Sequence, residues 1–419
     1  MREMKDSKVK WLGVIPLEWK VERVKHGFIR KKAEAHQDNP IVLSLARTGV
    51  RERDISNNEG QIAESYYNYN PVDVDDLLIN PMDLYSGANC SISKISGVIS
   101  PAYVNLRYRE GYNPQYYDYY FKLQYWLMAF FAHGKGVSYE NRWTLNAETL
   151  MNYPIIVPTE CEQRKIVDYL DAKCSKIDEI IEKHQVIIEK LKEYKLHLIQ
   201  ETVTKGLDRN AELRESGEIW IGKVPKHWDV LKLKSHTRMI TPMRDKPEDL
   251  SGDIPWVRIE DYNGKYIDSS REGFGVSEQT VKEMNLKVYP VGSILCTSSC
   301  DLGKCAIVAT PLVSNQRFIN IVPDKDTSSD YLYYVMLSNA DRMNHLSTGT
   351  IQANLSRVAF EHLLIQFPPL EEQKEIARYL DHKVEVIDST IMGKEKLVEK
   401  LREYKRSLIY EVVTGKKEV

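Results

Sequence analysis

The sequence predicts an α+β protein made of two tandem domains, each followed by a long helix. Three observations support this fold class. A tryptophan-rich segment, "WLGVIPLEW" at 11–19, returns as "WIGKVPKHW" at 220–228. A segment with helical periodicity at 162–204 returns at 372–414 without a gap. Between these segments, short apolar runs bounded by Gly, Pro, Asn and Asp are typical of a strand-rich domain.

Length and charge narrow the classes of function. A chain of 419 residues is too long for one compact core and indicates two or three domains. The net charge of −2 means that nucleic-acid binding would need local basic patches, such as the run at 20–32, although such runs are more often solvated helix faces. Because no apolar stretch is long enough to span a bilayer and no signal peptide is visible, we expect a cytoplasmic protein with no membrane partner.

The cysteines allow two interpretations. Cys296, Cys300 and Cys305 lie close together and could suggest a metal site. However, they lack a second paired CxxC and a suitably spaced histidine, so zinc is disfavoured. We expect reduced thiols and no bound metal.

Each half of the chain begins with the same head and continues into a body that differs between the halves. The two heads share Trp, Gly, Pro and Trp at equal spacing. The bodies are related more faintly, since "YDYYFKL" at 117–123 resembles "YLYYVML" at 331–337, whereas most of their sequence diverges. We predict a first domain at 1–157 and a second at 207–367.

The tails predict two long helices, at 158–206 and 368–419. Proline lies just before each, and Thr159 with Glu162 has the spacing of a capping box. Heptad spacing puts one set of residues at the first position of a helix–helix seam: Leu170, Ile177, Leu191, Leu380, Ile387 and Leu401. It puts Ile180, Ile187, Tyr194 and Tyr404 at the second seam position. Ile181, Ile188 and Ile391 then fall outside the seam, where they are expected to contact helices of a partner.

No motif for catalysis or cofactor binding is found. Asn80-Pro81 lacks the second proline and the aromatic residue of an adenine-methyltransferase loop. The glycine-containing segments lack the spacing of a phosphate loop, and no H-E-x-x-H or G-x-S-x-G occurs. The aromatic run at 111–131 could stack bases, but its helical spacing favours a buried helix. We therefore expect no catalytic residue and no bound cofactor.

Two equivalent polar loops, at 133–143 and 347–356, are candidates for base contacts, because Asn and Gln can read adenine while Arg and Lys can read guanine. An ordinary polar loop remains an equal alternative. The candidate residues are Lys135, Ser138, Asn141 and Arg142 in the first body and Thr350, Gln352, Asn354 and Arg357 in the second. Weaker candidates, chosen for charge, are Arg47, Arg51, Arg258, Lys304 and Arg317.

The W-x-G-x-x-P-x-x-W head, the Pro–Glu-Gln start of a long helix and the L-[KR]-E-Y-K…LI…VT tail together resemble the DNA-specificity subunit of Type I restriction–modification systems. The resemblance covers both copies. It implies two target-recognition domains held apart by two antiparallel helices, with no catalysis in this chain.

By the same resemblance, the partners are double-stranded DNA, two modification subunits and, where the source encodes them, two restriction subunits. S-adenosylmethionine, and ATP with magnesium, belong to those partners. Two other classes stay open at this stage. One is a single-chain modification or restriction enzyme with its own active site. The other is a purely structural coiled-coil scaffold.

Overall fold

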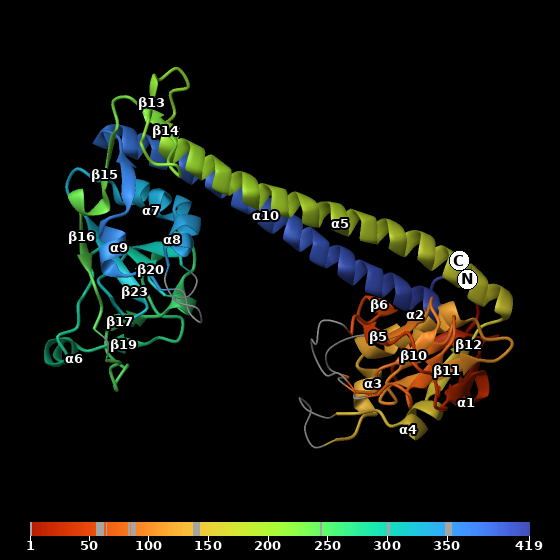
Figure 1. Cartoon of the computed structure of the whole chain (residues 1–419). Helices are drawn as coiled ribbons and strands as arrows, with labels where there is room; N and C mark the ends of the chain where they lie inside the picture. The colour runs from red at the N-terminus through yellow and green to blue at the C-terminus, as the bar shows by residue number, and fades with distance from the viewer. Residues whose placement is uncertain are drawn as a thin grey trace. The chain divides into compact units, whose positions relative to one another are not determined.

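The computed structural model describes residues 2–55, 63, 65–82, 84, 89–136, 143–243, 245–299, 302–347 and 354–419. It divides into two compact units. The first contains Met1–Gln185 and Glu395–Val419, and the second contains Val186–Lys394. Each unit therefore has one body together with part of both long helices, α5 (Glu160–Lys205) and α10 (Leu370–Val413) (Figure 1).

In the described residues, the first body is built from short strands and short helices. In chain order its elements are β1 (Met4–Asp6), β2 (Val14–Pro16), β3 (Lys20–Arg23), α1 (Val24–Gly27), β4 (Phe28–Lys31), β5 (Leu43–Ala46), β6 (Gly49–Glu52), β7 (Asn70–Val72), β8 (Leu77–Ile79), β9 (Cys90–Ile92), β10 (Gly97–Ile99), β11 (Val104–Tyr108), α2 (Pro114–Trp126), α3 (Ala129–Ala132), α4 (Ala147–Met151) and β12 (Pro154–Val157).

The second body follows α5 with a related series of elements. They are β13 (Leu213–Glu215), β14 (Lys223–Pro225), β15 (Asp229–Lys232), η1 (Leu233–Ser235), β16 (Thr237–Ile240), β17 (Ile254–Val257), η2 (Ile259–Asp261), β18 (Tyr266–Ile267), β19 (Gly275–Val276), α6 (Glu278–Glu283), β20 (Ile294–Thr297), β21 (Cys305–Val308), β22 (Val313–Ser314), β23 (Phe318–Pro323), α7 (Ser329–Ser338), α8 (Ala340–Leu346), α9 (Arg357–Glu361) and β24 (Leu364–Phe367).

Each body has its own central sheet, and the two sheets have matching strand orders. In the first body the strand order is β4-β11-β8-β9, and in the second it is β16-β23-β20-β21 with β18 added at the edge. In both, a strand that follows the head pairs antiparallel with the strand just before the long helix, as β3–β12 and β15–β24. The predicted α+β class is confirmed, and the faint sequence relation between the bodies corresponds to a shared fold.

The aromatic run of the first body forms the buried helix α2, as predicted. Asn113 caps its N-terminus by accepting hydrogen bonds from the backbone of Gln115 and Tyr116, and Pro114 occupies the first turn. Tyr116, Tyr117 and Tyr120 are fully buried. The equivalent helix α7 buries Tyr331 and Tyr334 in the second body. These tyrosines serve the core and are not exposed for base stacking.

Within each unit, α5 and α10 pack against each other in opposite directions. In the first unit, Lys405 Nζ contacts Asp178 Oδ2 at 2.6 Å. In the second, Lys195 Nζ contacts Asp388 Oδ1 at 2.6 Å. Partner positions on α10 fall as those on α5 rise, so the helices are antiparallel. Each residue of the first pair is 210 positions from its counterpart in the second, so the two contacts are copies of one another.

The prediction of which residues occupy the second position of the helix seam was wrong. Ile181, Ile188 and Ile391, expected outside the seam, are buried between the helices, with exposures of 8%, 6% and 7%. Ile180 and Ile187, expected inside, are exposed, as are Tyr194 and Tyr404. The residues at the first position, Leu170, Ile177, Leu191, Leu380, Ile387 and Leu401, are buried or half-buried as predicted. The apolar contacts therefore alternate by four and then three residues, instead of three and then four.

Among the described residues, no helix combines the length and the apolar character needed to cross a bilayer.

Candidate nucleic-acid interface

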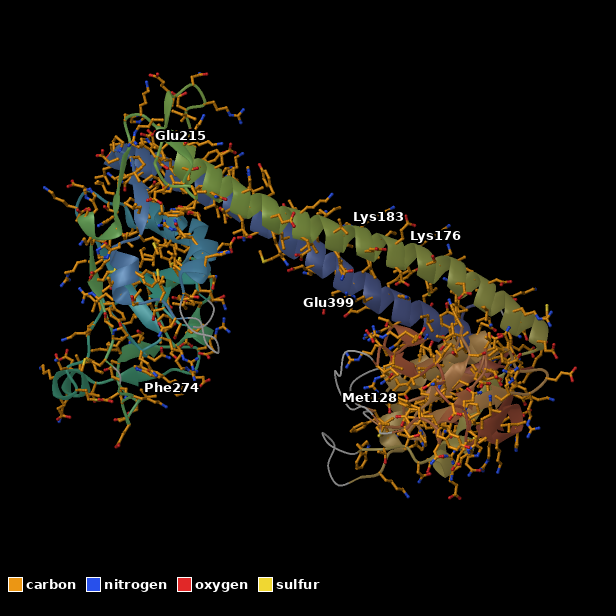
Figure 2. The ribbon with its side chains drawn as sticks, viewed as in Figure 1. Met128, Lys176, Lys183, Glu215, Phe274 and Glu399 are labelled. Atoms are coloured by element: carbon orange, nitrogen blue, oxygen red, sulfur yellow. The ribbon has the colours of Figure 1, made fainter. Side chains whose placement is uncertain are left out.

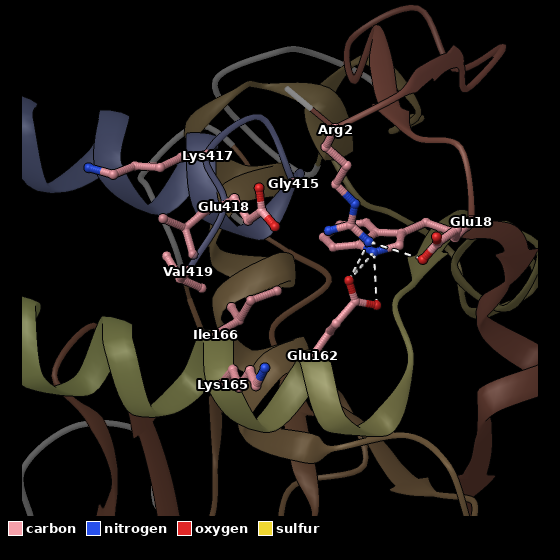
Figure 3. Close-up of a pocket in the computed structure, with 11 residues that line it drawn as sticks. Arg2, Glu18, Glu162, Lys165, Ile166, Gly415, Lys417, Glu418 and Val419 are labelled. Atoms are coloured by element: carbon pink, nitrogen blue, oxygen red, sulfur yellow. Dashed lines mark hydrogen bonds and ion pairs between the residues drawn. The ribbon is translucent and has the colours of Figure 1, made fainter.

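The first head is fixed to the start of α5 by a single carboxylate. Trp19 Nε1 donates to both oxygens of Glu162 at 3.2 Å, and Arg2 forms an ion pair with the same carboxylate. Thr159 and Glu162 complete the predicted capping box, in which Thr159 N donates to Glu162 Oε2 at 3.1 Å and Glu162 N donates to Thr159 Oγ1 at 3.3 Å. Figure 3 shows Arg2 and Glu162 meeting at the wall of a pocket beside the C-terminal segment.

These contacts set the charge state of Glu162. Burial alone would raise the pKa of its carboxyl. Hydrogen bonds from Trp19, Arg2 and Thr159 outweigh burial and hold that pKa below its ordinary value. The carboxylate is therefore a stable acceptor that joins the head to the helix.

The second head repeats the attachment with different neighbours. Trp228 Nε1 donates to Glu372 Oε2 at 3.1 Å, and His227 Nε2 lies 2.9 Å from the same oxygen. Pro369 stands where the first copy has Thr159, so this copy lacks the hydroxyl cap. The repeated tryptophan and glutamate thus share one structural role in the two units.

The glutamine after each of these glutamates connects the long helix to the body. Gln163 Oε1 accepts from Asn113 N at 2.7 Å, while its Nε2 donates to the carbonyls of Gly111 and Pro158, each at 3.0 Å. Gln373 makes the same pattern, accepting from Ser328 N at 2.8 Å. Both glutamines are buried. The Glu-Gln pair therefore positions both the head and the start of the aromatic helix against the long helix.

An apolar stripe remains exposed on the long helices, and it is repeated. On α5 it contains Ile187 and Tyr194, which are 39% and 55% exposed. On α10 it contains Leu397 and Tyr404, which are 41% and 55% exposed. We call these four residues the exposed stripe. Large apolar side chains in matching places mark a surface that could bind another chain.

Other exposed helix positions carry charge. Figure 2 shows Lys176 and Lys183 projecting outward from α5. Lys183 Nζ forms an ion pair with Glu179, one turn earlier. Other exposed apolar side chains, such as Ile180 and Met392, have a polar residue at the equivalent position of the other helix, whereas the exposed stripe is apolar in both copies.

Few residues of the two predicted base-reading loops lie in the described part of the chain. Ser138, Asn141, Arg142, Thr350 and Gln352 lie outside it. In the first loop, Lys135 is exposed and forms a backbone bridge with Thr144. A short helix and a strand follow each loop before the long helix begins, α4 and β12 in the first body and α9 and β24 in the second.

In the second body, the described part of the loop touches the central sheet. Asn354 is exposed and forms a backbone bridge with Ser299, and Leu355 N donates to Ser298 O at 2.8 Å. Arg357 begins α9, where its Nε bonds Glu361 at 2.7 Å. This loop is therefore held beside the connection between β20 and β21.

Among the weaker candidates, four are exposed and Arg258 is engaged within the fold. Arg47 and Arg51 are exposed on the β5–β6 hairpin, with Arg47 in its turn. Arg258 is engaged within the fold: one of its terminal nitrogens lies 2.7 Å from Glu272, and its guanidinium covers the Phe274 ring. Lys304 and Arg317 are exposed beside the strands of the second sheet. The roles of all these residues in DNA contact stay predictions.

Comparison with known proteins shows which proteins this chain is similar to. Residues 225–400 match the family model described as the Type I restriction modification DNA specificity domain. The matched segment contains most of the second body and the first part of α10, so this part of the chain is similar to that specificity domain. The Type I restriction enzyme MjaIX specificity subunit of Methanocaldococcus jannaschii is 36% identical over 181 residues, which cover 42% of each chain. The MjaVIII specificity subunit of the same organism is 23% identical over 368 residues, covering 81% of this chain and 80% of the relative.

Two solved structures share the fold. One, from work on complex assembly and conformational transition of the type I R-M system, has a TM-score of 0.73 at 14% identity and covers 95% of this chain and 98% of its own. The HsdS subunit from Thermoanaerobacter tengcongensis has a TM-score of 0.52 at 14% identity, covering 96% and 98%. The first curated relatives are matched over only part of their length, 42% for MjaIX and 62% for the putative MjaX subunit.

Sequence reasoning missed the contacts that attach each head and the correct seam. The Trp19–Glu162 contact joins residues 143 positions apart, which no local pattern indicates. The seam had a usable signal. Ile180 and Ile181 are both apolar, but their counterparts are the polar Thr390 and the apolar Ile391. Comparing the two copies at these positions selects the phase that the structure has.

Proposed function

We propose that this chain is a sequence-specific duplex-DNA-binding subunit of a Type I restriction–modification complex, with no catalytic activity of its own. It reads a two-part, asymmetric target and directs partner subunits, which methylate adenine with S-adenosylmethionine and flip the base to do so. Where restriction subunits are present, it directs cleavage as well. The observation that carries this proposal is that the junction between head and long helix is repeated, while the two bodies attached to it differ. We call this repeated junction, together with the long helices, the frame.

The frame accounts for a two-part target. The same junction, made by Trp19 with Glu162 and by Trp228 with Glu372, sets a body on each long helix. The bodies then present different surfaces, such as the Arg47 hairpin in the first and the loop around Asn354 in the second. Two different surfaces on equivalent frames are suited to two different half-sites. Base contacts from these surfaces would specify the sequence, while phosphate contacts would position the chain.

The long helices account for a fixed spacing. At about 1.5 Å per residue, a continuous helix of 46 residues extends roughly 70 Å. Because duplex DNA presents an equivalent groove face every 10–10.5 base pairs, we propose half-sites about one turn apart, with unread bases between them. Inserting one heptad after Glu182 would add roughly 10 Å, or about 3 base pairs of rise, and would preserve the helix phase.

Genome-wide mapping of methylated sites tests this ruler. The insertion variant should methylate the same half-sites with a longer gap, although an unchanged α10 could reduce the shift below about 3 base pairs. Changed half-site bases with an unchanged gap would contradict it.

The partner surface is the exposed stripe. We propose that one modification subunit packs on Ile187 and Tyr194 and a second packs on Leu397 and Tyr404. Aromatic anchors surrounded by polar residues are typical of such interfaces. The seam residues Ile181, Ile188 and Ile391 are not available for this role, because α5 and α10 bury them.

Co-purification with modification subunits tests the surface. Tyr404→Ser should reduce binding from two modification chains to one, and Tyr194→Ser combined with Tyr404→Ser should abolish it. Met392→Ser is the matched control, because Met392 is 63% exposed but its counterpart in the first copy is Glu182. If the double variant still binds two chains, the stripe is not the interface.

Substitutions in the second loop test DNA reading. Gln352→Ala and Asn354→Ala should each cost about 1–3 kcal/mol at one base of the target, whereas loss of a phosphate contact would weaken all sequences alike. The two variants should be measured on duplexes that carry single base changes. Unchanged affinity and base preference in both variants would show that the loop does not read DNA. Methylation by the purified chain alone would instead favour a single-chain enzyme.

A further inference from the structure

Cys296 and Cys305 lie opposite each other on neighbouring antiparallel strands of the second body. The register of β20 with β21 pairs these two residues directly. The next pair along, Thr297 with Lys304, is hydrogen-bonded, with Thr297 N donating to Lys304 O at 2.9 Å. Because hydrogen-bonded and non-hydrogen-bonded pairs alternate along an antiparallel ladder, the two cysteines occupy a non-hydrogen-bonded pair, where side chains are closest.

This position suits disulfide formation. Non-hydrogen-bonded pairs have Cα atoms about 4.5 Å apart, which is within the range of about 4.4–6.8 Å that a disulfide accepts. Both cysteines are buried, with exposures of 1% for Cys296 and 6% for Cys305. Burial and the adjacent Cys305 thiol raise the pKa of Cys296, so this sulfur stays protonated at neutral pH. The pair is therefore a stable dithiol until an oxidant reaches it.

The residues next to the pair hold a predicted DNA-contacting loop. Ser298 N donates to Arg317 O at 2.8 Å, and Ser298 O accepts from Leu355 N at 2.8 Å. Ser299 forms a backbone bridge with Asn354. A change in the spacing of β20 and β21 at Cys296 would thus pass directly to the loop that contains Asn354.

The first body has the same geometry with only one thiol. Ile79 lies opposite Cys90 on β8 and β9, and the next pair, Asn80 with Asn89, is hydrogen-bonded at 2.9 Å. The dithiol is therefore a property of the second body alone. Because Ile79 takes the place of Cys296 in the first body, Cys296→Ile removes the dithiol with a residue that the same position of this fold already holds.

We propose that Cys296 and Cys305 are a redox modification site, at which a hydroperoxide closes a cross-strand disulfide and weakens DNA binding by the second body. Cys305, the more exposed of the two residues, loses its thiol proton, and its sulfur attacks a peroxide oxygen. The O–O bond breaks, and the leaving oxygen takes up the proton and departs as water, which gives a sulfenic acid. The Cys296 sulfur then attacks that sulfur, and the S–O bond breaks to release a second water. Hydrogen peroxide is reduced by two electrons, and the two thiols lose two hydrogens.

Closure would reshape the sheet locally. Opposed side chains have Cβ atoms about 4.5–5.5 Å apart, whereas a disulfide holds them near 3.8 Å. The Cβ atoms of Cys296 and Cys305 must therefore approach each other, which changes the local geometry of β20 and β21 beside Ser298 and Ser299. The effect on DNA rests on the proposed function, whereas disulfide formation does not.

The chemistry is tested with the full chain carrying Cys300→Ser, because Cys300 lies outside the described residues and could compete for pairing. The protein is treated with hydrogen peroxide, remaining thiols are blocked with N-ethylmaleimide, and peptides are mapped by mass. We expect a 296–305 linked peptide that dithiothreitol releases and that is absent after Cys296→Ile. Thermal unfolding of Cys296→Ile verifies that this variant folds. If both cysteines stay free while the exposed Cys161 is oxidised, or if Cys296 links to another cysteine, the assignment is wrong.

The consequence is tested on a duplex that carries the mapped target. Oxidation should weaken binding by about fivefold or more, equivalent to one lost base contact, and dithiothreitol should restore it. The Cys296→Ile chain should show no change on oxidation. A linked peptide with unchanged affinity would overturn the effect on DNA. If the reduced chain does not bind any duplex, the proposed function fails, while the peptide map still decides the dithiol chemistry.

Discussion

We expect that apolar residues can replace Asp118 and Lys122 on α2 together, whereas replacing only one of the two should destabilise the protein. Lys122 Nζ lies 2.6 Å from Asp118 Oδ2, and the side chains are only 26% and 13% exposed. Burial raises the pKa of the Asp118 carboxyl, and the charge of Lys122 opposes this. The equivalent positions of α7 are the buried apolar residues Leu332 and Met336. The second body thus builds the same helix without the pair.

The magnitudes follow from this burial. Removing one partner of a fully buried pair costs about 3–5 kcal/mol, because the remaining charge is left without compensation. Since this pair keeps some exposure, we expect about 2–4 kcal/mol for Asp118→Leu alone. The double variant Asp118→Leu with Lys122→Met copies the second body. It should be within about 1 kcal/mol of the parent or more stable.

Urea unfolding followed by circular dichroism measures both variants. Because the two units can unfold in separate transitions, the variants are compared by the urea midpoint of the transition that Asp118→Leu shifts. A double variant as unstable as Asp118→Leu would refute the reasoning, since the loss would then come from packing and not from an unpaired charge. A neutral single variant would refute it as well.

The remaining predictions concern the helix frame. Ile181→Ala should lower the free energy of unfolding by about 2–4 kcal/mol, whereas the neighbouring Ile180→Ala should change it by less than about 0.5 kcal/mol, and equal effects would contradict the observed seam. Glu162→Gln should lower the free energy of unfolding by about 1–2 kcal/mol at neutral pH, whereas Glu160→Gln on the exposed first turn should change it little. Because the folded pKa of Glu162 is lowered, this difference should be present above pH 4.5 and vanish as the pH falls through the folded pKa; a difference that grows in acid would be inconsistent. Gln163→Ala should increase hydrogen exchange at the start of α2, and unchanged exchange there would refute its positioning role.

The repeat made most of the fold predictable. Residues of the tails recur at an offset of 210 with no gap, so the helices and their equivalence could be inferred from sequence alone. The capping box at Thr159 and the buried helix α2 were also correct, because both depend on local patterns. The seam phase failed where two apolar residues stand side by side, as at Ile180 and Ile181, since a single copy fits either phase.

The candidate site was less predictable, for a physical reason. Base contacts depend on the conformation of loops, and composition gives only the chemistry that a loop could supply. Arg258 illustrates this limit: its charge suggested DNA contact, but the side chain pairs with Glu272. The Trp19–Glu162 attachment was also beyond local pattern reasoning, because it joins residues 143 positions apart.

The most direct test of the central claim is a genome-wide map of methylated adenines in cells that express this chain with its modification subunits. The account predicts two different half-sites separated by a gap of unread bases of constant length. Replacing residues 207–367 with the equivalent body of a relative should change one half-site and leave the other and the gap intact. A single continuous motif, or a replacement that alters both half-sites, would contradict the proposal that each body reads its own half of the target.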